Sequence, residues 1–201
     1  MNDIENDKQY SQFTRSMNEF LRPTFPGVLR RIRYNYLNME IYLDQNMKDL
    51  DPITGLIDTL FDNNLPVRIG IVFTGDSEKA YKTGGILYYL VAEMKNKKQS
   101  PLKAWQKWVE MKSEKFSNDD INKKITEESV YYKSAVASAN YFKSLGMKSE
   151  STILVNGALV PDLTFDEDGE IEQKVYEFLL EAVPDIQRAV YYGQLDQVRA
   201  K

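Results

Sequence analysis

The feature that most constrains the fold of this chain is the stretch from Asn38 to Phe73. Its first six residues, NMEIYL, alternate as in a half-buried strand, and Val67–Phe73 (VRIGIVF) is a near-continuous apolar run typical of a strand covered on both faces. Between them, Asp51-Pro52 opens a helix with one apolar stripe at helical spacing: Ile53, Leu56, Ile57, Leu60 and Phe61. A strand, a helix and a strand joined by short connections predict a right-handed parallel βαβ unit.

Helical patterns dominate the next segment, about 76–146. Three apolar stripes at helical spacing lie within Ile86–Met94, Leu102–Val109 and Tyr132–Phe142. Ser100-Pro101, a capping residue followed by proline at the first helical position, starts the second of these helices. The segment is therefore predicted to be a helical insertion after the βαβ unit.

The last third of the chain predicts a hairpin followed by two helices. Two short apolar segments flank Asn156-Gly157, and this dipeptide favours a type I′ turn between antiparallel strands. An amphipathic helix is predicted from Ile171, and Pro184 starts one more helix, about 184–198, that Gly193 interrupts. The element order βαβ-α-ββα predicts a thioredoxin-like α/β fold with a helical insertion and an extra C-terminal helix.

The first 37 residues are predicted to form a separate arm. Residues 1–22 are polar with scattered aromatic residues, and we expect them to pack loosely. Pro23 and Pro26-Gly27 break any helix there, and the basic segment Val28–Tyr34 is predicted to be a short helix. The thioredoxin-like domain is then expected to occupy residues 38–201.

The composition of the chain excludes most of the side-chain chemistry that enzymes use. It has no cysteine, so it has no disulfide, thiolate nucleophile or cysteine-ligated zinc, and no histidine, the usual general base. A net charge of −4 gives no general attraction to nucleic acid or to anionic membranes. The polar, acidic start of the sequence does not resemble a signal peptide, and no apolar run is long enough to span a bilayer.

Several segments resemble one family. IENDKQY at Ile4–Tyr10 and FLRPTFPGVLRRIRYNYLN at Phe20–Asn38 resemble the entry into the third thioredoxin-like domain of UDP-glucose:glycoprotein glucosyltransferase. The resemblance continues in three shorter segments: LPVRIGIVF at Leu65–Phe73, LVNG at Leu154–Gly157 and IQRAVYYGQL at Ile186–Leu195. One departure is that Lys148–Ser151 lacks the proline that the family has before the third strand, so a thioredoxin-type peptide groove is in doubt.

The resemblance implies a location in the lumen of the endoplasmic reticulum and a parent enzyme that glucosylates incompletely folded glycoproteins. In that family UDP-glucose and a divalent metal act in a separate catalytic domain, and no segment of this chain resembles it. We therefore expect a non-catalytic, redox-inactive chain without a cofactor or metal of its own. The expected partners are misfolded glycoproteins and other domains of the same polypeptide, with no nucleic acid and no membrane. The alternative is a structural spacer.

Three other motifs favour ordinary structural interpretations. The acidic segment 164–169 resembles a calcium loop, but it lacks the first aspartate and the twelfth-position glutamate. Gly75, Gly84 and Gly85 follow a strand without phosphate-loop spacing. Arg30, Arg31 and Arg33 form a single basic turn in an acidic chain, which is weak support for RNA binding.

Two features are predicted to serve recognition. The first is an aromatic patch on the helical insertion, expected to bind apolar segments of clients unless it forms the core of the insertion: Trp105, Trp108, Phe116, Tyr131 and Phe142. The second is the C-terminal helix, whose predicted apolar face would dock reversibly and cover such a patch: Ile186, Val190, Tyr191 and Leu195.

Overall fold

A computed structural model describes the whole chain except residues 45–46, 48–49, 118, 148–150, 166–169 and 196–201. It begins with two short 3₁₀ helices, η1 (Lys8–Tyr10) and η2 (Met17–Leu21). The βαβ unit follows as β1 (Leu37–Leu43), α1 (Asp51–Asp62) and β2 (Val67–Phe73). Four helices make up the insertion: α2 (Glu78–Asn96), α3 (Leu102–Ser113), α4 (Asp119–Asn122) and α5 (Val130–Ser144). The chain then forms β3 (Thr152–Val155), β4 (Ala158–Leu159), α6 (Glu170–Glu181) and α7 (Val183–Tyr191).

The four strands form one mixed sheet in the order β2-β1-β3-β4. β1 and β2 are parallel, with Leu37 opposite Val67 and Leu43 opposite Phe73, which confirms the parallel unit. β3 is antiparallel to β1 and to β4. Asn156 and Gly157 both have positive φ (50° and 82°), as a type I′ turn requires, so the predicted hairpin is confirmed.

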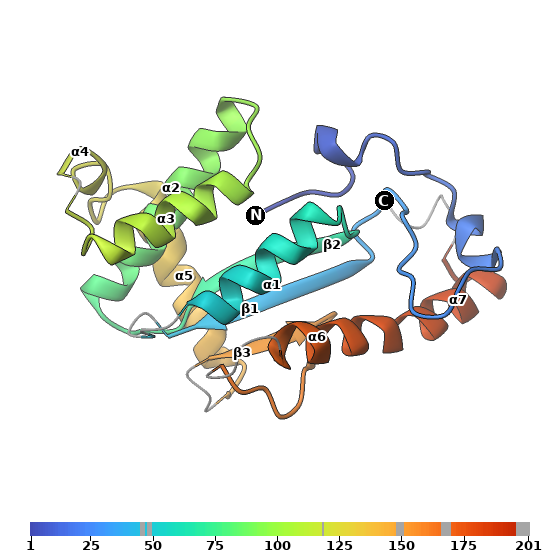
Figure 1. Cartoon of the computed structure of the whole chain (residues 1–201). Coiled ribbons are helices and arrows are strands. Elements are labelled where there is room, and N and C mark those ends of the chain that lie inside the picture. The colour runs from blue at the N-terminus through green and yellow to red at the C-terminus, as the bar shows by residue number, and fades with distance from the viewer. Residues whose placement is uncertain (45–46, 48–49, 118, 148–150, 166–169, 196–201) are drawn as a thin grey trace.

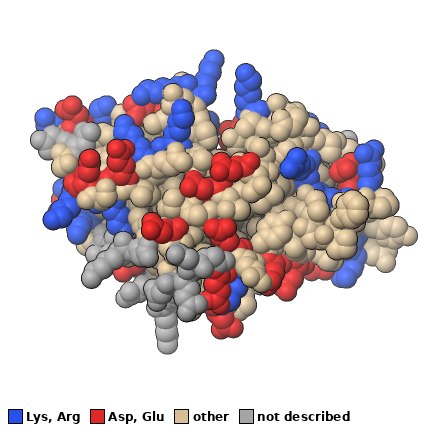
Figure 2. Space-filling view, viewed as in Figure 1, with Lys and Arg blue, Asp and Glu red and all other residues tan. Residues whose placement is uncertain are grey.

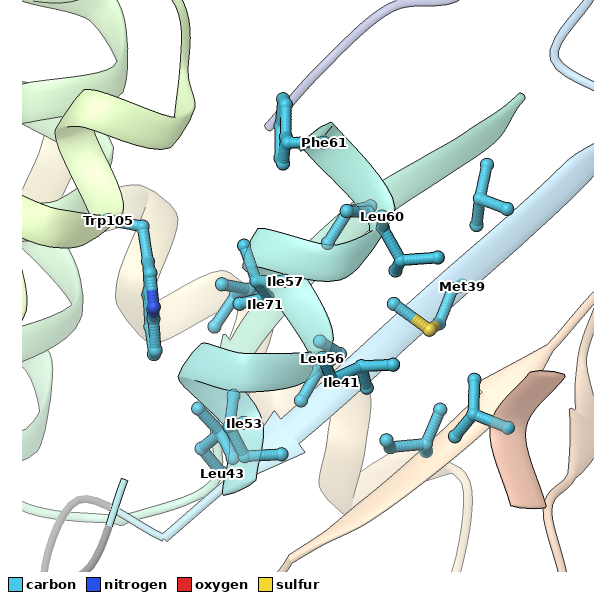
Figure 3. Close-up of a cluster of buried hydrophobic side chains, with 14 of the residues drawn as sticks. Met39, Ile41, Leu43, Ile53, Leu56, Ile57, Leu60, Phe61, Ile71 and Trp105 are labelled. Atoms are coloured by element: carbon cyan, nitrogen blue, oxygen red, sulfur yellow. The ribbon is translucent and has the colours of Figure 1, made fainter. Parts of the chain in front are cut away.

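Helices cover both faces of the sheet. Alternate residues of β1 face α1, where Met39, Ile41 and Leu43 pack against the apolar stripe of that helix (Figure 3). α6 lies beside α1 on the same face (Figure 1). On the opposite face, Tyr42 and Leu154 form a smaller cluster with Phe142 of α5. The thioredoxin-like α/β fold with a helical insertion and an additional C-terminal helix is therefore confirmed.

The N-terminal arm is packed closely, and the expectation of loose packing is wrong. Its apolar side chains are buried: Ile4, Tyr10, Phe13, Met17 and Phe20. Asn2 fixes the arm to the edge of the sheet, since the Ile69 N–H donates to its Oδ1 (2.7 Å) while its Nδ2 donates to the Val67 carbonyl (2.9 Å). A side-chain amide thus takes the place of a neighbouring strand on β2 and protects that edge.

The short helix predicted for Val28–Tyr34 is absent from the structure, which shows an extended segment there. Ile32 forms an isolated parallel bridge with Thr14, and the Arg33 N–H donates to the Thr14 carbonyl (2.7 Å). The Arg33 N–H therefore bonds to the arm and the Ile32 N–H bonds to the Arg30 carbonyl (2.9 Å), so neither bonds to a carbonyl one helical turn earlier. The C-terminal helix was expected at about 184–198, but α7 ends at Tyr191 and is followed by Gly193 in the left-handed region (φ 67°); residues 196–198 lie outside the described part of the chain.

Candidate functional site

The two tryptophans of the predicted client patch lie in the core. Trp105 and Trp108 are fully buried and stack with ring centroids 5.3 Å apart. The Trp108 indole N–H donates to the Thr83 carbonyl of α2 (3.0 Å), and that of Trp105 donates to Thr54 Oγ1 of α1 (3.3 Å). Because α3 packs against both α1 and α2, no face of these rings is left for a client.

The remaining residues of that patch are also used inside the fold. Phe142 is buried against Tyr42, with ring centroids 5.1 Å apart. Phe116 and Tyr131 are half-buried, and Phe116 lies 5.8 Å from Trp108 between ring centroids. The prediction of an exposed aromatic patch is therefore wrong for Trp105, Trp108 and Phe142. The alternative, that these residues form a core, is the arrangement observed.

The C-terminal helix α7 is docked on the arm. Val190 is buried, Ile186 and Leu195 are half-buried against the core, and the Gln187 Nε2 donates to the Phe20 carbonyl of η2 (3.0 Å). The predicted apolar face is wrong for Tyr191, which points to solvent with 72% of its surface exposed. Reversible docking of this helix stays a prediction.

Exposed apolar side chains are concentrated in two segments, the one after η2 and the end of α7, and α7 packs against η2. Among the described residues nine large hydrophobic side chains are exposed, and five of them belong to the segment after η2 or to the end of α7. We call these five the arm–α7 patch: Leu21 (47% exposed), Phe25 (84%), Val28 (49%), Tyr191 (72%) and Tyr192 (68%). Figure 2 shows a broad uncharged surface at the right of the view, where Figure 1 places α7 and the segment that follows η2.

Local sequence explains why this patch is exposed. Pro26 and Gly27 (φ 78°) turn the chain after η2, so that it crosses the outside of the molecule instead of forming a helix. Two hydrogen bonds hold it there, from the Tyr176 hydroxyl to the Gly27 carbonyl (3.0 Å) and from the Arg30 guanidinium to the Arg22 carbonyl. The patch is thus a fixed surface built on coil and the last turn of a helix.

The basic residues near this patch have structural roles where the structure shows their contacts. Arg30 is buried, and its carbonyl accepts a hydrogen bond from the Tyr36 hydroxyl (2.6 Å). Burial raises the pKa of the Tyr36 phenol, so this group is a neutral donor at physiological pH. Arg30 therefore stabilises the chain path, and the RNA-binding interpretation gains no support from it.

The other motifs also have structural explanations or fall outside the described residues. Gly84 and Gly85 lie inside α2, where added Cβ atoms would meet Phe73 at 3.0 Å and Ile125 at 2.7 Å, so they permit close helix packing.

Of the acidic segment 164–169, residues 166–169 lie outside the described part of the chain. Within the described ranges no group of three Asp or Glu side chains is placed to hold a metal ion. None of the helices described there is long and apolar enough to cross a membrane.

A large cavity of about 950 Å³ lies on the sheet face that α5 only partly covers. Its walls include Glu40 and Arg68 of the sheet, Tyr88 of α2 and Tyr141 of α5. The Tyr88 hydroxyl donates to the Ile71 carbonyl (3.2 Å) and lies 3.1 Å from Ser138 Oγ, so part of this polar lining is already paired within the domain. The arm–α7 patch therefore remains the stronger candidate for apolar recognition.

The fold and the site together define a class of protein, a thioredoxin-like α/β domain without cysteine that carries exposed apolar side chains at its arm and at α7. Comparison with known families agrees: a model of the thioredoxin-like domain matches residues 1–200, and the chain belongs to this family.

The chain is similar to several UDP-glucose:glycoprotein glucosyltransferases. The chain is 28% identical over 216 residues to human UDP-glucose:glycoprotein glucosyltransferase 1 and 26% identical over 219 residues to the Drosophila melanogaster UDP-glucose:glycoprotein glucosyltransferase. The identity to human UDP-glucose:glycoprotein glucosyltransferase 2 is 24% over 218 residues. These alignments cover 97–98% of the chain but only 14% of each relative's length.

Proposed function

We propose that this chain is a non-catalytic recognition domain of a UDP-glucose:glycoprotein glucosyltransferase, and that it binds exposed apolar segments of misfolded glycoproteins. The observation that carries the proposal is the arm–α7 patch, because soluble proteins rarely leave several large apolar side chains together in solvent without an interaction partner. The absence of cysteine is consistent with non-covalent binding, since a mixed disulfide with a client requires a thiol.

Glucose transfer would then take place in another part of the same polypeptide. UDP-glucose and its metal would be bound there, and the whole protein would act in the lumen of the endoplasmic reticulum. The similarity of this chain to about one seventh of the glucosyltransferases supports this division of roles. In this scheme the domain holds an unfolded segment of the client while its glycan reaches the catalytic domain.

Composition of the patch fits the binding of unfolded chains. Tyrosine and phenylalanine offer a large contact area at low cost in side-chain entropy, and the tyrosine hydroxyls tolerate water when no client is bound. Tyr191 and Tyr192 lie edge to face, with ring centroids 5.3 Å apart. Such a surface would bind apolar segments of many sequences weakly, as a general folding sensor requires.

The rival function is that of a structural spacer in an assembly of thioredoxin-like domains. In that case the arm–α7 patch would be covered by a neighbouring domain of the same polypeptide. The isolated chain distinguishes the two functions, because a spacer surface has no reason to prefer denatured glycoproteins over native ones.

The test measures binding of the purified chain to one glycoprotein in native and denatured forms. We expect preference for the denatured form, and about tenfold weaker binding after Phe25→Ser, Tyr191→Ser and Tyr192→Ser are combined. The matched control removes three exposed apolar residues elsewhere, through Val130→Ser, Tyr141→Ser and Leu159→Ser. No preference for the denatured form would favour the spacer. Equal losses in both triple variants would remove the arm–α7 patch from the proposal.

A further inference from the structure

A second cavity lies in the helical insertion, at the junction of α2, α4 and the end of α3. Its volume is about 510 Å³, within the range of ligand pockets. The floor is apolar and consists of Ile86, Ile125 and the half-buried Phe116. Three lysines and one glutamate line the walls: Glu78, Lys79 and Lys82 from α2, and Lys115 from the segment after α3. We call this cavity the lysine pocket.

Charge is distributed unevenly between the insertion and the rest of the chain. Residues 76–146 contain 13 lysines against nine aspartates and glutamates, although the whole chain has a net charge of −4. Figure 2 shows lysine and arginine along the upper edge of the molecule with acidic groups among them at the upper left, and further acidic groups across the centre and lower edge. The lysine pocket therefore lies in a segment whose net charge is positive, which favours the binding of anions.

Two of the three lysines have no charged partner in the described structure. Lys82 pairs with Glu78 on the same helix, and Glu127 contributes to raising the pKa of Lys82. No ion pair among the described residues involves Lys79 or Lys115, and both side chains are exposed. Two cationic groups from different elements thus stand free beside an apolar floor.

The wall formed by Lys115 and Phe116 is held in place. Both residues have positive φ (55° and 53°) at the end of α3, where the Phe116 N–H donates to the Met111 carbonyl (2.7 Å). The Asn122 Nδ2 then donates to the Phe116 carbonyl (2.6 Å). These bonds fix the backbone that carries Phe116 before any ligand arrives, which lowers the entropy lost when this wall is ordered on binding.

We propose that the lysine pocket binds acidic segments of client polypeptides that also carry an apolar side chain. The apolar side chain would contact Phe116, Ile86 and Ile125, while carboxylates on either side of it pair with Lys79 and Lys115. Two simpler ligands fit the pocket less well. An inorganic anion would make no contact with the apolar floor, and a purely apolar segment would leave the two lysines without a charged partner. This proposal rests on the proposed function, since it names the client chemistry that a second surface of the same domain selects.

The test titrates the purified chain with the blocked peptide Glu-Asp-Leu-Leu-Asp-Glu and records tryptophan fluorescence and heat. Trp108 reports on the pocket because its ring lies 5.8 Å from Phe116 between centroids. Two comparison peptides separate the parts of the ligand: Gln-Asn-Leu-Leu-Asn-Gln lacks the charge, and Glu-Asp-Ser-Ser-Asp-Glu lacks the apolar side chains. We expect only the first peptide to bind well, and its binding to weaken several-fold between low and high salt because exposed charges are screened.

Removing the two free lysines should weaken the interaction with the acidic peptide. We expect Lys79→Gln combined with Lys115→Gln to reduce the affinity about tenfold, which corresponds to two partly exposed charge pairs. The matched control, Lys98→Gln combined with Lys103→Gln, removes the same charge from the turn after α2 and from α3, outside the pocket, and we expect less than a twofold change. Equal losses in both double variants, or equal binding of the three peptides, would overturn the proposal.

A competition experiment separates this proposal from the proposed function. The acidic peptide is added to the chain bound to a denatured glycoprotein, and displacement is expected if the client uses the lysine pocket. Binding of the denatured glycoprotein without competition would overturn the lysine pocket and leave the proposed function intact. Binding of the peptide without binding of any denatured glycoprotein would confirm a peptide site and reject the client role.

Discussion

The aromatic residues of α3 and those of the arm–α7 patch have opposite environments. Trp105 and Trp108 come from a regular amphipathic helix and are fully buried, whereas Phe25 and Tyr191 come from coil and from a helix end and are largely exposed. This contrast shows that an aromatic stripe at helical spacing indicates a helix face that another element will cover. Aromatic residues without such spacing, next to proline and glycine, are the better candidates for a recognition surface.

The sharpest test of this contrast compares one buried and one exposed aromatic residue. We expect Trp108→Ala to lower the free energy of unfolding by about 3–5 kcal/mol, because it leaves a cavity and removes contacts with Trp105 and Phe73. Tyr192→Ala should change it by less than about 0.5 kcal/mol. Chemical denaturation measures both. Similar losses for the two variants would contradict the contrast.

The second test concerns the attachment of the N-terminal arm to the edge of the sheet. Asn2→Ala should cost about 2 kcal/mol of stability, because it leaves the Ile69 N–H and the Val67 carbonyl without these bonds at the sheet edge. Asn6→Ala, which changes an exposed amide of the same arm, is the matched control. Hydrogen exchange at Ile69 should rise only in the first variant, and an unchanged rate would show that the arm does not protect this edge.

A third test examines whether the insertion is packed as densely as the core. An alanine Cβ at Gly85 would meet Ile125 Cγ2 at 2.7 Å, so we expect Gly85→Ala to cost about 1–2 kcal/mol despite the better helix propensity of alanine. In Gly70→Ala the new Cβ would meet only ordinary contacts at 3.8 Å or more, and we expect no loss. A neutral Gly85→Ala would show that α2 and the neighbouring Ile125 can separate, and that this part of the insertion is packed less densely than the core.

Local signals explain what could be predicted from the sequence. The βαβ unit depends on a nearly continuous apolar strand and one helical stripe, and the hairpin depends on Asn156-Gly157, so both follow from short segments. The arm could not be predicted in the same way, because Ile4 and Tyr10 show no period and their burial depends on contacts between Asn2 and a strand 65 residues away. The apolar stripe of α3 follows from the helical spacing of its residues, but this spacing does not predict which elements will cover the stripe.

The fourth test concerns the C-terminal cap of α2, where we expect a substitution to increase stability. Just after α2, Lys98 has φ 56° and the Gln99 N–H donates to the Met94 carbonyl (2.9 Å), a helix cap at which glycine is usual. Lys98→Gly should raise the free energy of unfolding by about 0.5–1 kcal/mol, because glycine adopts this conformation without strain. A loss instead of a gain would show that the Lys98 side chain makes a stabilising contact.

The smallest expected effect concerns Tyr81, an aromatic residue between the two extremes because it is half-buried and held by a hydrogen bond. Its hydroxyl donates to Asp76, which raises the pKa of Tyr81 to about 12, and Lys143 of α5 pairs with the same carboxylate. The hydrogen bond from Lys143, with that from Tyr81, lowers the pKa of Asp76 in the folded protein. A lowered folded pKa means that this contribution is present above the unfolded value near 3.8 and is lost as the pH falls through the folded value.

Asp76→Asn should therefore be slightly less stable than the wild type at pH 7, and the difference should disappear near pH 2. Because the pair is exposed to solvent, 1 M salt should also reduce the difference at pH 7. Thermal unfolding of the two proteins across this pH range measures the effect. A difference that persists at pH 2 would show that the side-chain amide itself, and not the lost charge, disturbs the turn between β2 and α2. Tyr81 would then depend on packing, as the tryptophans of α3 do.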